Sequence, residues 1–133
     1  MFLTKFETHA FAMLRIVVGF LFLCHGSQKL FNMPPSEHVM SGTIIWVSGT
    51  IEFFGGLLIL LGLFTRWASF ISCGEMAFAY WMSHGTHAVL PIINHGELAL
   101  IYCFIFLYIS TQGSGSFSID HLWNKNKKNR IRS

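Results

Sequence analysis

The stretch IIWVSGTIEFFGGLLILLGLF, residues 44–64, decides the fold class of this chain. Its only charged residue is Glu52, and the rest is dominated by Ile, Leu, Phe and Gly. A helix that crosses the hydrocarbon core of a bilayer needs about 20 mostly apolar residues. The stretch therefore predicts a membrane-spanning helix.

The composition of the whole chain agrees with this prediction. Of the 133 residues, 53% are hydrophobic and only 11% are charged, whereas an ordinary soluble domain has about 25% charged residues. This composition excludes a disordered chain, a basic nucleic-acid-binding domain and a disulfide-stapled secreted scaffold. We expect residues 1–124 to form a single membrane domain and residues 125–133 to form a basic tail.

Three further apolar runs have the character of membrane spans, at residues 11–31, 67–83 and 96–112. The segments between the runs contain helix breakers such as Pro34, Pro35 and Pro91. The first run is long, carries internal charges and lacks a small-x-small cleavage site, so we do not expect a cleaved signal peptide. The prediction is an all-α, four-transmembrane-helix bundle.

The positive charges predict the orientation of this bundle. Lys5, Arg66 and a basic tail lie on one side of the predicted spans, and the two loops on the other side contain no Lys or Arg. The positive-inside rule therefore places both termini in the cytoplasm. The tail is short and lacks interleaved aromatic residues, so we interpret it as a topology signal attracted to anionic lipid, with no nucleic acid as partner.

Charged residues inside the spans are the candidates for a functional site. A charge at mid-bilayer costs about 2.5–3.5 kcal/mol on insertion scales, and such residues persist when they pair, face a cavity or carry out chemistry. Helix rise places Glu52 and Glu75 at a similar depth, about 12 Å below the outer surface. We expect a polar pocket in the external half of the bundle, built from His25, Lys29, Glu52, Glu75 and Glu97.

Charge counting leaves two interpretations of this cluster open. Three carboxylates face Lys29 and, at the cytoplasmic end, Arg15, so either His25 is protonated or one carboxyl keeps its proton. The first interpretation is a proton-handling pocket in which Glu75, with no cation within its own span, exchanges its proton most readily. The second is a set of structural ion pairs that lock the helices together. Arg15 itself is interpreted as structural, with a side chain that snorkels toward the cytoplasm.

Glycines predict where the helices approach each other. Gly19 and Gly26 fall on one stripe of the first span, and Gly49 and Gly56 flank Glu52 in the second. Small residues allow membrane helices to pack closely. This packing would also bring the charged side chains within reach of one another.

Cysteines and histidines give weaker signals. Cys24, Cys73 and Cys103 are far apart in sequence and are interpreted as packing residues, although two of them could meet across helices. No Cys-x-x-Cys motif is present, which argues against a dithiol made from adjacent cysteines. A loose set of imidazoles does not have the spacing of a known zinc signature, so we predict no metal site at His84, His87 and His95.

Four ordered motifs resemble the DoxX family of small four-helix bacterial membrane proteins. They are RIVVG at 15–19 with HGSQKLF at 25–31, GTIEFFGG at 49–56 with LGLFTR at 61–66, NHGELALIYCF at 94–104, and GSGSFSID at 113–120. The resemblance implies a multi-pass protein of the bacterial inner membrane. It also implies a redox context, because family members are linked to quinone-coupled sulfur oxidation and to membrane complexes that manage thiol and oxidative stress.

Two functions therefore compete. The first is a membrane subunit of a redox system that holds a quinone or a sulfur compound in the polar pocket, with Tyr80, Tyr102 and Asn94 in support. A redox partner protein would then be needed, because the chain has no haem motif or nucleotide-binding loop. The alternative is a small transporter or binding protein for a lipophilic or anionic ligand, with a carboxyl as its proton site. A scaffold for a membrane partner and a homo-oligomer remain open.

Overall fold

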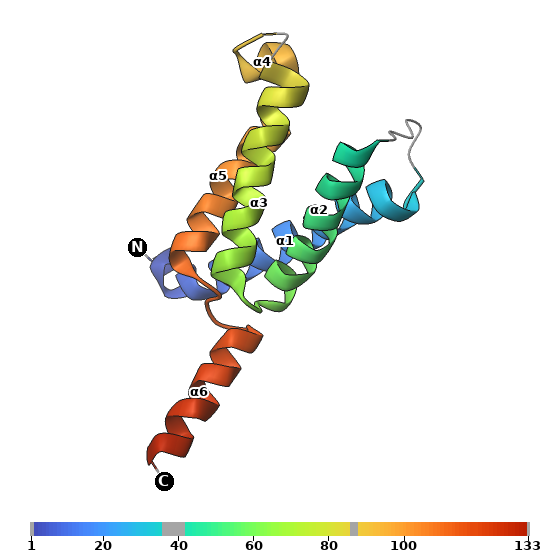
Figure 1. Cartoon of the computed structure of the whole chain (residues 1–133). Coiled ribbons are helices and arrows are strands. Elements are labelled where there is room, and N and C mark those ends of the chain that lie inside the picture. Colours follow the sequence, from blue (N-terminus) through green and yellow to red (C-terminus); the bar gives the residue numbers. More distant parts are fainter. Residues whose placement is uncertain (1, 36–41, 86–87, 133) are drawn as a thin grey trace.

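The computed structural model describes residues 2–35, 42–85 and 88–132, and all of the regular secondary structure in these ranges is helical (Figure 1). The predicted all-α class is therefore confirmed. The four principal helices are α1 (Glu7–Phe31), α2 (Thr43–Leu61), α3 (Thr65–Tyr80) and α5 (Glu97–Gln112). The remaining elements are a 3-10 turn at Phe2–Phe6, a π-helical turn at Trp81–Gly85, the short α4 (Pro91–Asn94) and α6 (Ile119–Arg132).

Two of the described helices have the length and hydropathy of membrane spans. They are Phe2–Phe31, with a mean hydropathy of 1.7, and Thr43–Leu61, with a mean hydropathy of 2.0. The apolar α5 is shorter, with 16 residues. Each predicted span corresponds to a principal helix, but α2 ends three residues before the predicted Phe64 because Gly62 takes a left-handed conformation and turns the chain into α3.

Close contact between glycines and backbone joins α1 to α2. A Cβ atom at Gly26 would collide with the backbone of Phe53, and one at Gly56 would collide with the backbone of Leu23. Only glycine permits this approach, because any side chain at these positions would force the helices apart. The predicted role of the glycines in helix packing is confirmed.

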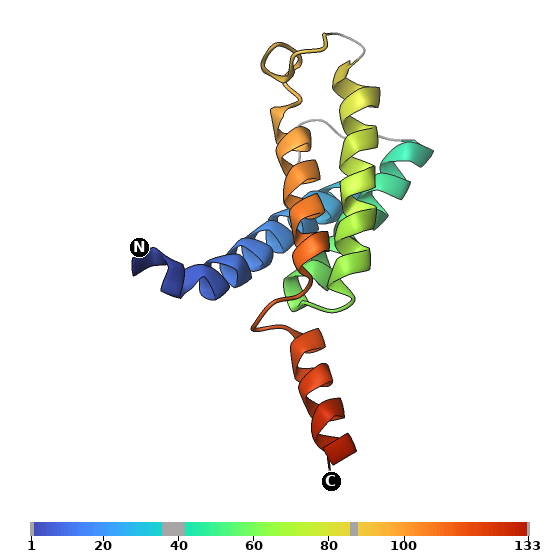
Figure 2. The same cartoon turned by 90° about the vertical axis from the view of Figure 1, so that its left-hand side faces the viewer.

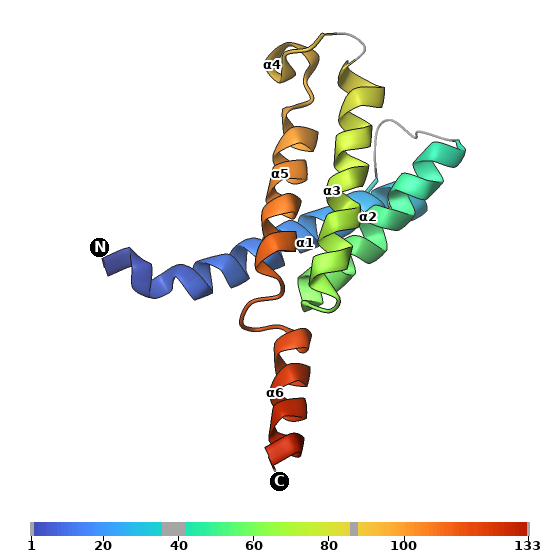
Figure 3. The ribbon, with the colours of Figure 1, turned by 60° about the vertical axis from the view of Figure 1, so that its left-hand side comes forward.

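The second packed pair is α3 and α5, which run antiparallel and side by side (Figure 1). A short turn connects α2 to α3, and the two helices diverge with distance from that turn (Figure 1). The long α1 crosses the α3–α5 pair at a steep angle, and its N-terminal half extends beyond the other helices (Figures 2 and 3).

Polar groups lie inside the molecule, and large apolar side chains cover its outside. The fully buried residues include Arg15, Ser69 and Ser72, whereas Phe70 and Phe104 are 60% and 62% exposed. Small and polar residues between helices and bulky apolar residues on the outer surface are typical of a protein that is solvated by lipid. An aromatic and aliphatic core still fills the centre, with Phe22, Ile59, Phe106 and Ile109.

The C-terminal region forms a helix that includes most of the expected basic tail. Residues Ile119–Arg132 form a helix that projects from the bundle at the end where α2 turns into α3 (Figure 1). Ser118 begins this helix, because its Oγ accepts a hydrogen bond from the N–H of His121 at 3.2 Å. The Ser118 Oγ–H also donates to the carbonyl of Gly115 at 2.8 Å, so this side chain holds the turn that precedes α6.

Candidate functional site

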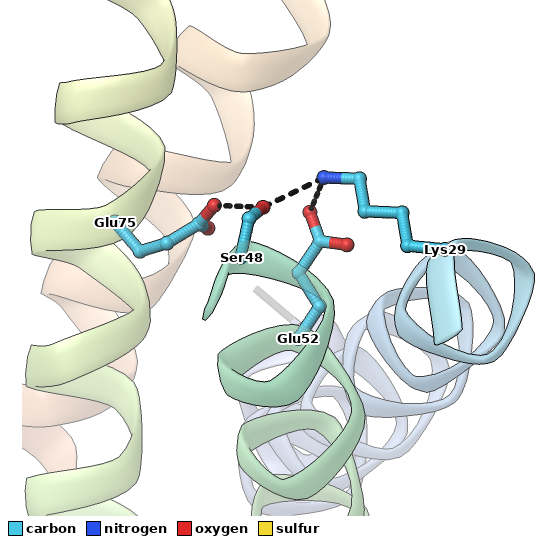
Figure 4. Close-up of polar contacts among 4 residues, drawn as sticks. All are labelled: Lys29, Ser48, Glu52 and Glu75. Atoms are coloured by element: carbon cyan, nitrogen blue, oxygen red, sulfur yellow. Dashed lines mark hydrogen bonds and ion pairs between the residues drawn. The ribbon is translucent and has the colours of Figure 1, made fainter. Parts of the chain in front are cut away.

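A continuous chain of polar contacts connects α1, α2 and α3 (Figure 4). The Lys29 Nζ atom donates to Glu52 Oε1 at 2.7 Å and to Ser48 Oγ at 2.8 Å. The Ser48 hydroxyl in turn donates to Glu75 Oε1 at 2.7 Å. Ser48 therefore connects the Lys29–Glu52 ion pair to the second carboxyl, and we call these four residues the polar chain.

Local helix geometry explains why these side chains meet. Ser48 and Glu52 are four residues apart on α2 and so lie one above the other on the same face. Gly49 lies against the base of Lys29, where an added Cβ would come within 2.9 Å of the Lys29 Cβ. The missing side chain at Gly49 thus lets α1 bring its cation directly over the polar face of α2.

The polar chain lines a cavity of about 410 Å³ between α1, α2, α3 and α5. Four of the five predicted pocket residues line it, namely His25, Lys29, Glu52 and Glu75. Aromatic and imidazole groups form further parts of the wall, from Phe22, Phe78, His84, His95 and Tyr102. His25 and Tyr102 contact each other edge to face, with ring centroids 6.1 Å apart.

The fifth predicted residue, Glu97, lies outside this cavity and is exposed. It precedes the cavity-lining Tyr102 by five residues, which corresponds to about 140° around an α-helix. Its neighbours Leu98 and Ala99 face the cavity instead. We expected Glu97 to join the pocket because of its depth, but its position around α5 directs it elsewhere.

Both carboxyls of the polar chain have an oxygen without a partner. Glu52 Oε2 and Glu75 Oε2 are buried, and neither forms a hydrogen bond within the described part of the protein. A buried carboxylate oxygen without a partner is costly, because the group has lost its water. Each of these oxygens therefore keeps an unused capacity to accept a hydrogen bond or a proton.

A second space reaches the polar chain from another direction. It has a volume of about 350 Å³ and lies between α2 and α3, where it is lined by Val47, Ile51, Ile71 and other apolar residues. Ser48 and Glu75 line both this groove and the central cavity. The apolar groove thus meets the central cavity at one carboxyl.

Ser48 was missed in the sequence analysis, although a signal for it was present. It precedes Glu52 by four residues, so if this segment is helical the two side chains lie next to each other on one face. The sequence did not show where Glu75 lies, because Glu75 belongs to another helix. The packing of α2 on α3 brings Glu75 within hydrogen-bond distance of the Ser48 hydroxyl, which thereby connects Glu75 to Lys29.

The opposite end of the bundle holds a different set of charges, formed by Arg15, Arg66 and Asp120, which we call the basal clasp. The guanidinium of Arg15 is fully buried and donates to the carbonyls of Ile59 at 2.7 Å, Leu60 at 2.8 Å and Phe117 at 2.7 Å. These contacts fit the structural role expected for Arg15, but the carbonyls at the end of α2 hold the side chain inside the molecule instead of letting it extend toward the cytoplasm.

The other two members of the basal clasp also satisfy helix ends. Asp120 accepts hydrogen bonds from the backbone N–H groups of Phe64 at 3.1 Å and Thr65 at 3.2 Å, where α3 begins. Arg66 donates to the carbonyls of Ser110 at 3.0 Å and Thr111 at 2.7 Å, where α5 ends. These charges match the helix dipoles and free backbone groups that they contact.

Tyr80 and Asn94, both predicted as supporting residues, hold the segment between α3 and α5. The Tyr80 hydroxyl donates to the carbonyl of Val89 at 2.8 Å, and the Asn94 amide donates to that hydroxyl at 3.2 Å. The Asn94 Oδ1 atom also accepts from the N–H of Gly96 at 2.8 Å. Both residues therefore shape the rim of the cavity.

The loose histidine set is only partly described. His84 and His95 line the cavity, and His87 lies outside the described residues. A ring nitrogen of His84, Nδ1, is 2.9 Å from the carbonyl oxygen of Asn94. Within the described ranges, no three His, Cys, Asp or Glu side chains are grouped closely enough to hold a metal ion.

Comparison with known proteins bears on the identity of the chain. The DoxX family model matches residues 10–85. An uncharacterized protein of Haemophilus influenzae is 40% identical over 130 residues, which cover 92% of this chain and 97% of that protein. The inner membrane protein YqjF of Escherichia coli is 28% identical over 128 residues, which cover 91% and 97% of the two chains. No solved structure matches the chain significantly.

The matched region contains α1, α2 and α3, and with them all four residues of the polar chain. The resemblance that the sequence motifs indicated is thereby confirmed over more than half of the chain. The two relatives align over almost their full lengths, and one of them is named an inner membrane protein. This chain therefore belongs to the DoxX family of membrane proteins.

Proposed function

We propose that this protein is a membrane subunit of a redox system and binds a lipid-soluble ligand of the quinone class in the central cavity. The observation that carries the proposal is the polar chain, whose four residues line a cavity of about 410 Å³ and whose two carboxyls each keep a buried oxygen without a partner among the described residues. The adjoining apolar groove between α2 and α3 supplies a place for an isoprenoid tail. A polar head and an apolar tail would thus each meet a matching surface.

The residues of the polar chain would have different roles in binding the ligand. The ammonium of Lys29 fixes Glu52 through an ion pair at 2.7 Å. Glu75 receives only the Ser48 hydroxyl and has no cation as a direct partner among the described residues. Glu75 is therefore the group that would donate a hydrogen bond or a proton to a carbonyl oxygen in the cavity. Reduction of a quinone consumes two protons together with two electrons. A carboxyl that exchanges protons, such as Glu75, could supply one of these protons.

The membrane arrangement that belongs to this function is a four-span bundle over residues 1–124, with both termini in the cytoplasm of a bacterium. The charge asymmetry of the loops supports this orientation. Labelling of I93C and K128C variants in intact cells and in inverted vesicles tests it. We expect the two positions to react from opposite sides, and reaction of both from the same side would contradict the topology.

Equilibrium binding of a short-tailed ubiquinone analogue to the protein in lipid nanodiscs tests the site. Loss of one neutral hydrogen bond costs about 0.5–1.5 kcal/mol, so we expect Glu75→Leu, which removes the donor, to weaken binding by up to about tenfold. Glu97→Leu is the matched control, because it makes the same chemical change outside the cavity. Equal binding by the wild type and both variants would overturn the proposed site.

A proton-linked transporter or binding protein for a lipophilic ligand is the second candidate. It is favoured by the position of Ser48 and Glu75, which line both the cavity and the groove. The Glu75 carboxyl would then be accessible from both the cavity and the groove. Ligand uptake into proteoliposomes under an imposed proton gradient distinguishes this candidate, because the redox subunit predicts binding without uptake.

A further inference from the structure

Two of the three cysteines meet across a helix–helix contact. The Sγ atoms of Cys73 on α3 and Cys103 on α5 are 3.7 Å apart, and both residues are free thiols. A disulfide bond is about 2.05 Å long, so closing the pair requires a shift of less than about 2 Å, which two helices can share. Thirty residues separate the cysteines in the sequence, and so no motif revealed the pair.

The pair lies deep in the span and close to the cavity. Cys73 is eight residues from the start of α3, which corresponds to about 12 Å along the helix. Met76 and Ala99, which line the cavity, are three and four residues from Cys73 and Cys103 on their respective helices. The thiols therefore lie about one helical turn, or 5.4 Å, beyond the cavity wall.

We infer that Cys73 and Cys103 form a redox-active dithiol that reduces a lipid-soluble two-electron acceptor of the quinone class. In the step, two S–H bonds break and one S–S bond forms between α3 and α5. The two electrons and two protons that are released convert one quinone to one hydroquinone. The dithiol is oxidised, the quinone is reduced, and no further reactant is needed for this half of a cycle.

The position of the thiols determines the class of the acceptor. The pair packs against the apolar core that contains Phe106 and Ile109, and partly buried apolar neighbours surround it. A polar oxidant dissolved in water has to cross about 12 Å of apolar helix packing to reach the pair. Neither cysteine lines the groove or the cavity, but both are only half-buried, so a quinone dissolved in the bilayer can approach the pair from the lipid-facing side of α3 and α5. The choice of the quinone class rests on the proposed function.

Cys24 provides an internal control. It lies on α1, is half-buried like the other two cysteines, and has no thiol partner among the described residues. An oxidant that attacks thiols indiscriminately would modify Cys24 as well as the pair. Selective loss of two thiols is therefore the signature of the dithiol.

The test treats the protein in lipid nanodiscs with a short-tailed ubiquinone analogue under anaerobic conditions. Free thiols are counted after denaturation, the intact mass is measured, and hydroquinone is quantified by its ultraviolet absorbance. The wild type and Cys24→Ser should each lose two thiols and two hydrogens per chain, with one hydroquinone formed per disulfide. Cys73→Ser and Cys103→Ser should form neither an intramolecular disulfide nor hydroquinone.

Two further outcomes separate this inference from the proposed function. If the analogue binds but the wild type keeps all three thiols, the dithiol inference is overturned while the binding site stands. If the wild type loses two thiols but Glu75→Leu reacts at the same rate, the dithiol stands and the acceptor does not use the proposed site. Equal thiol loss in the wild type and in Cys73→Ser would also overturn the inference.

Discussion

The charged side chains at the two ends of the molecule have different kinds of partner. At the basal clasp, the side chains of Arg15, Arg66 and Asp120 bind backbone groups at the ends of helices. In the polar chain, side chains bind mainly one another, and a carboxyl oxygen of Glu52 and one of Glu75 have no partner among the described residues. The difference indicates that the basal clasp stabilises helix ends, and it supports the proposal that the polar chain binds a ligand.

The largest expected effect is at Arg15. Hydrogen bonds to a charged group are worth about 1.5–3 kcal/mol each, and Arg15→Met removes the three that Arg15 donates to backbone carbonyls. We expect a loss of unfolding free energy of at least about 3 kcal/mol, measured by denaturant titration in mixed micelles. Lys125→Met, at an exposed position on α6, is the control and should change stability little. A loss of less than about 1 kcal/mol would contradict the role of the clasp.

The Lys29–Glu52 pair should show the second largest effect. Lys29→Met leaves the buried Glu52 without its cation, and Glu52→Gln leaves Lys29 with a neutral partner. Each change should destabilise the protein, and the double variant should recover part of the loss. A double-mutant cycle should give a coupling energy of about 0.5–3 kcal/mol. Strictly additive losses would show that the two residues act independently.

Asp120 should show a smaller effect, because its hydrogen bonds stabilise only one helix start. Loss of a capping side chain costs about 0.5–2 kcal/mol, and Asp120→Ala removes the acceptor for the N–H groups of Phe64 and Thr65. Thermal unfolding measures this loss. Quinone-analogue binding by the folded variant should equal that of the wild type, since the basal clasp lies away from the cavity. Weakened binding would contradict the proposal that the basal clasp stabilises the fold without contributing to the ligand site.

Ser48 should have the smallest effect on stability and a clear effect on the site. Ser48→Ala removes one hydrogen bond from Lys29 and one to Glu75 but leaves the ion pair intact, so we expect a loss of about 1 kcal/mol. Infrared difference spectra measure the carboxyl band of Glu75 as the pH is changed. The titration of this band should shift in Ser48→Ala and the band should vanish in Glu75→Gln. Identical spectra in the wild type and Glu75→Gln would make Glu75 a structural residue.

Much of the architecture was predictable from the sequence, because hydrophobic runs and glycine spacing are local properties. The run at 44–64 indicated α2, and the glycines at 26 and 56 indicated the contact between α1 and α2. The sequence also indicated that Lys29 and Glu52 lie in the same half of the molecule, but Lys29 is two residues from the end of α1 and Glu52 is nine residues from the start of α2, so the Lys29 side chain has to reach inward to form the pair. These features depend on residue type and helical period, which the sequence contains directly.

The exact membership of the site was decided only by the tertiary structure. Glu97 lies at the expected depth but on the wrong side of α5, and Ser48 became important only when α3 placed Glu75 beside it. Cys73 and Cys103 likewise meet because α3 packs along α5, not because of any spacing in the chain. Depth along a helix follows from counting residues, but rotation about the helix axis and the choice of neighbours follow from how whole helices pack against each other.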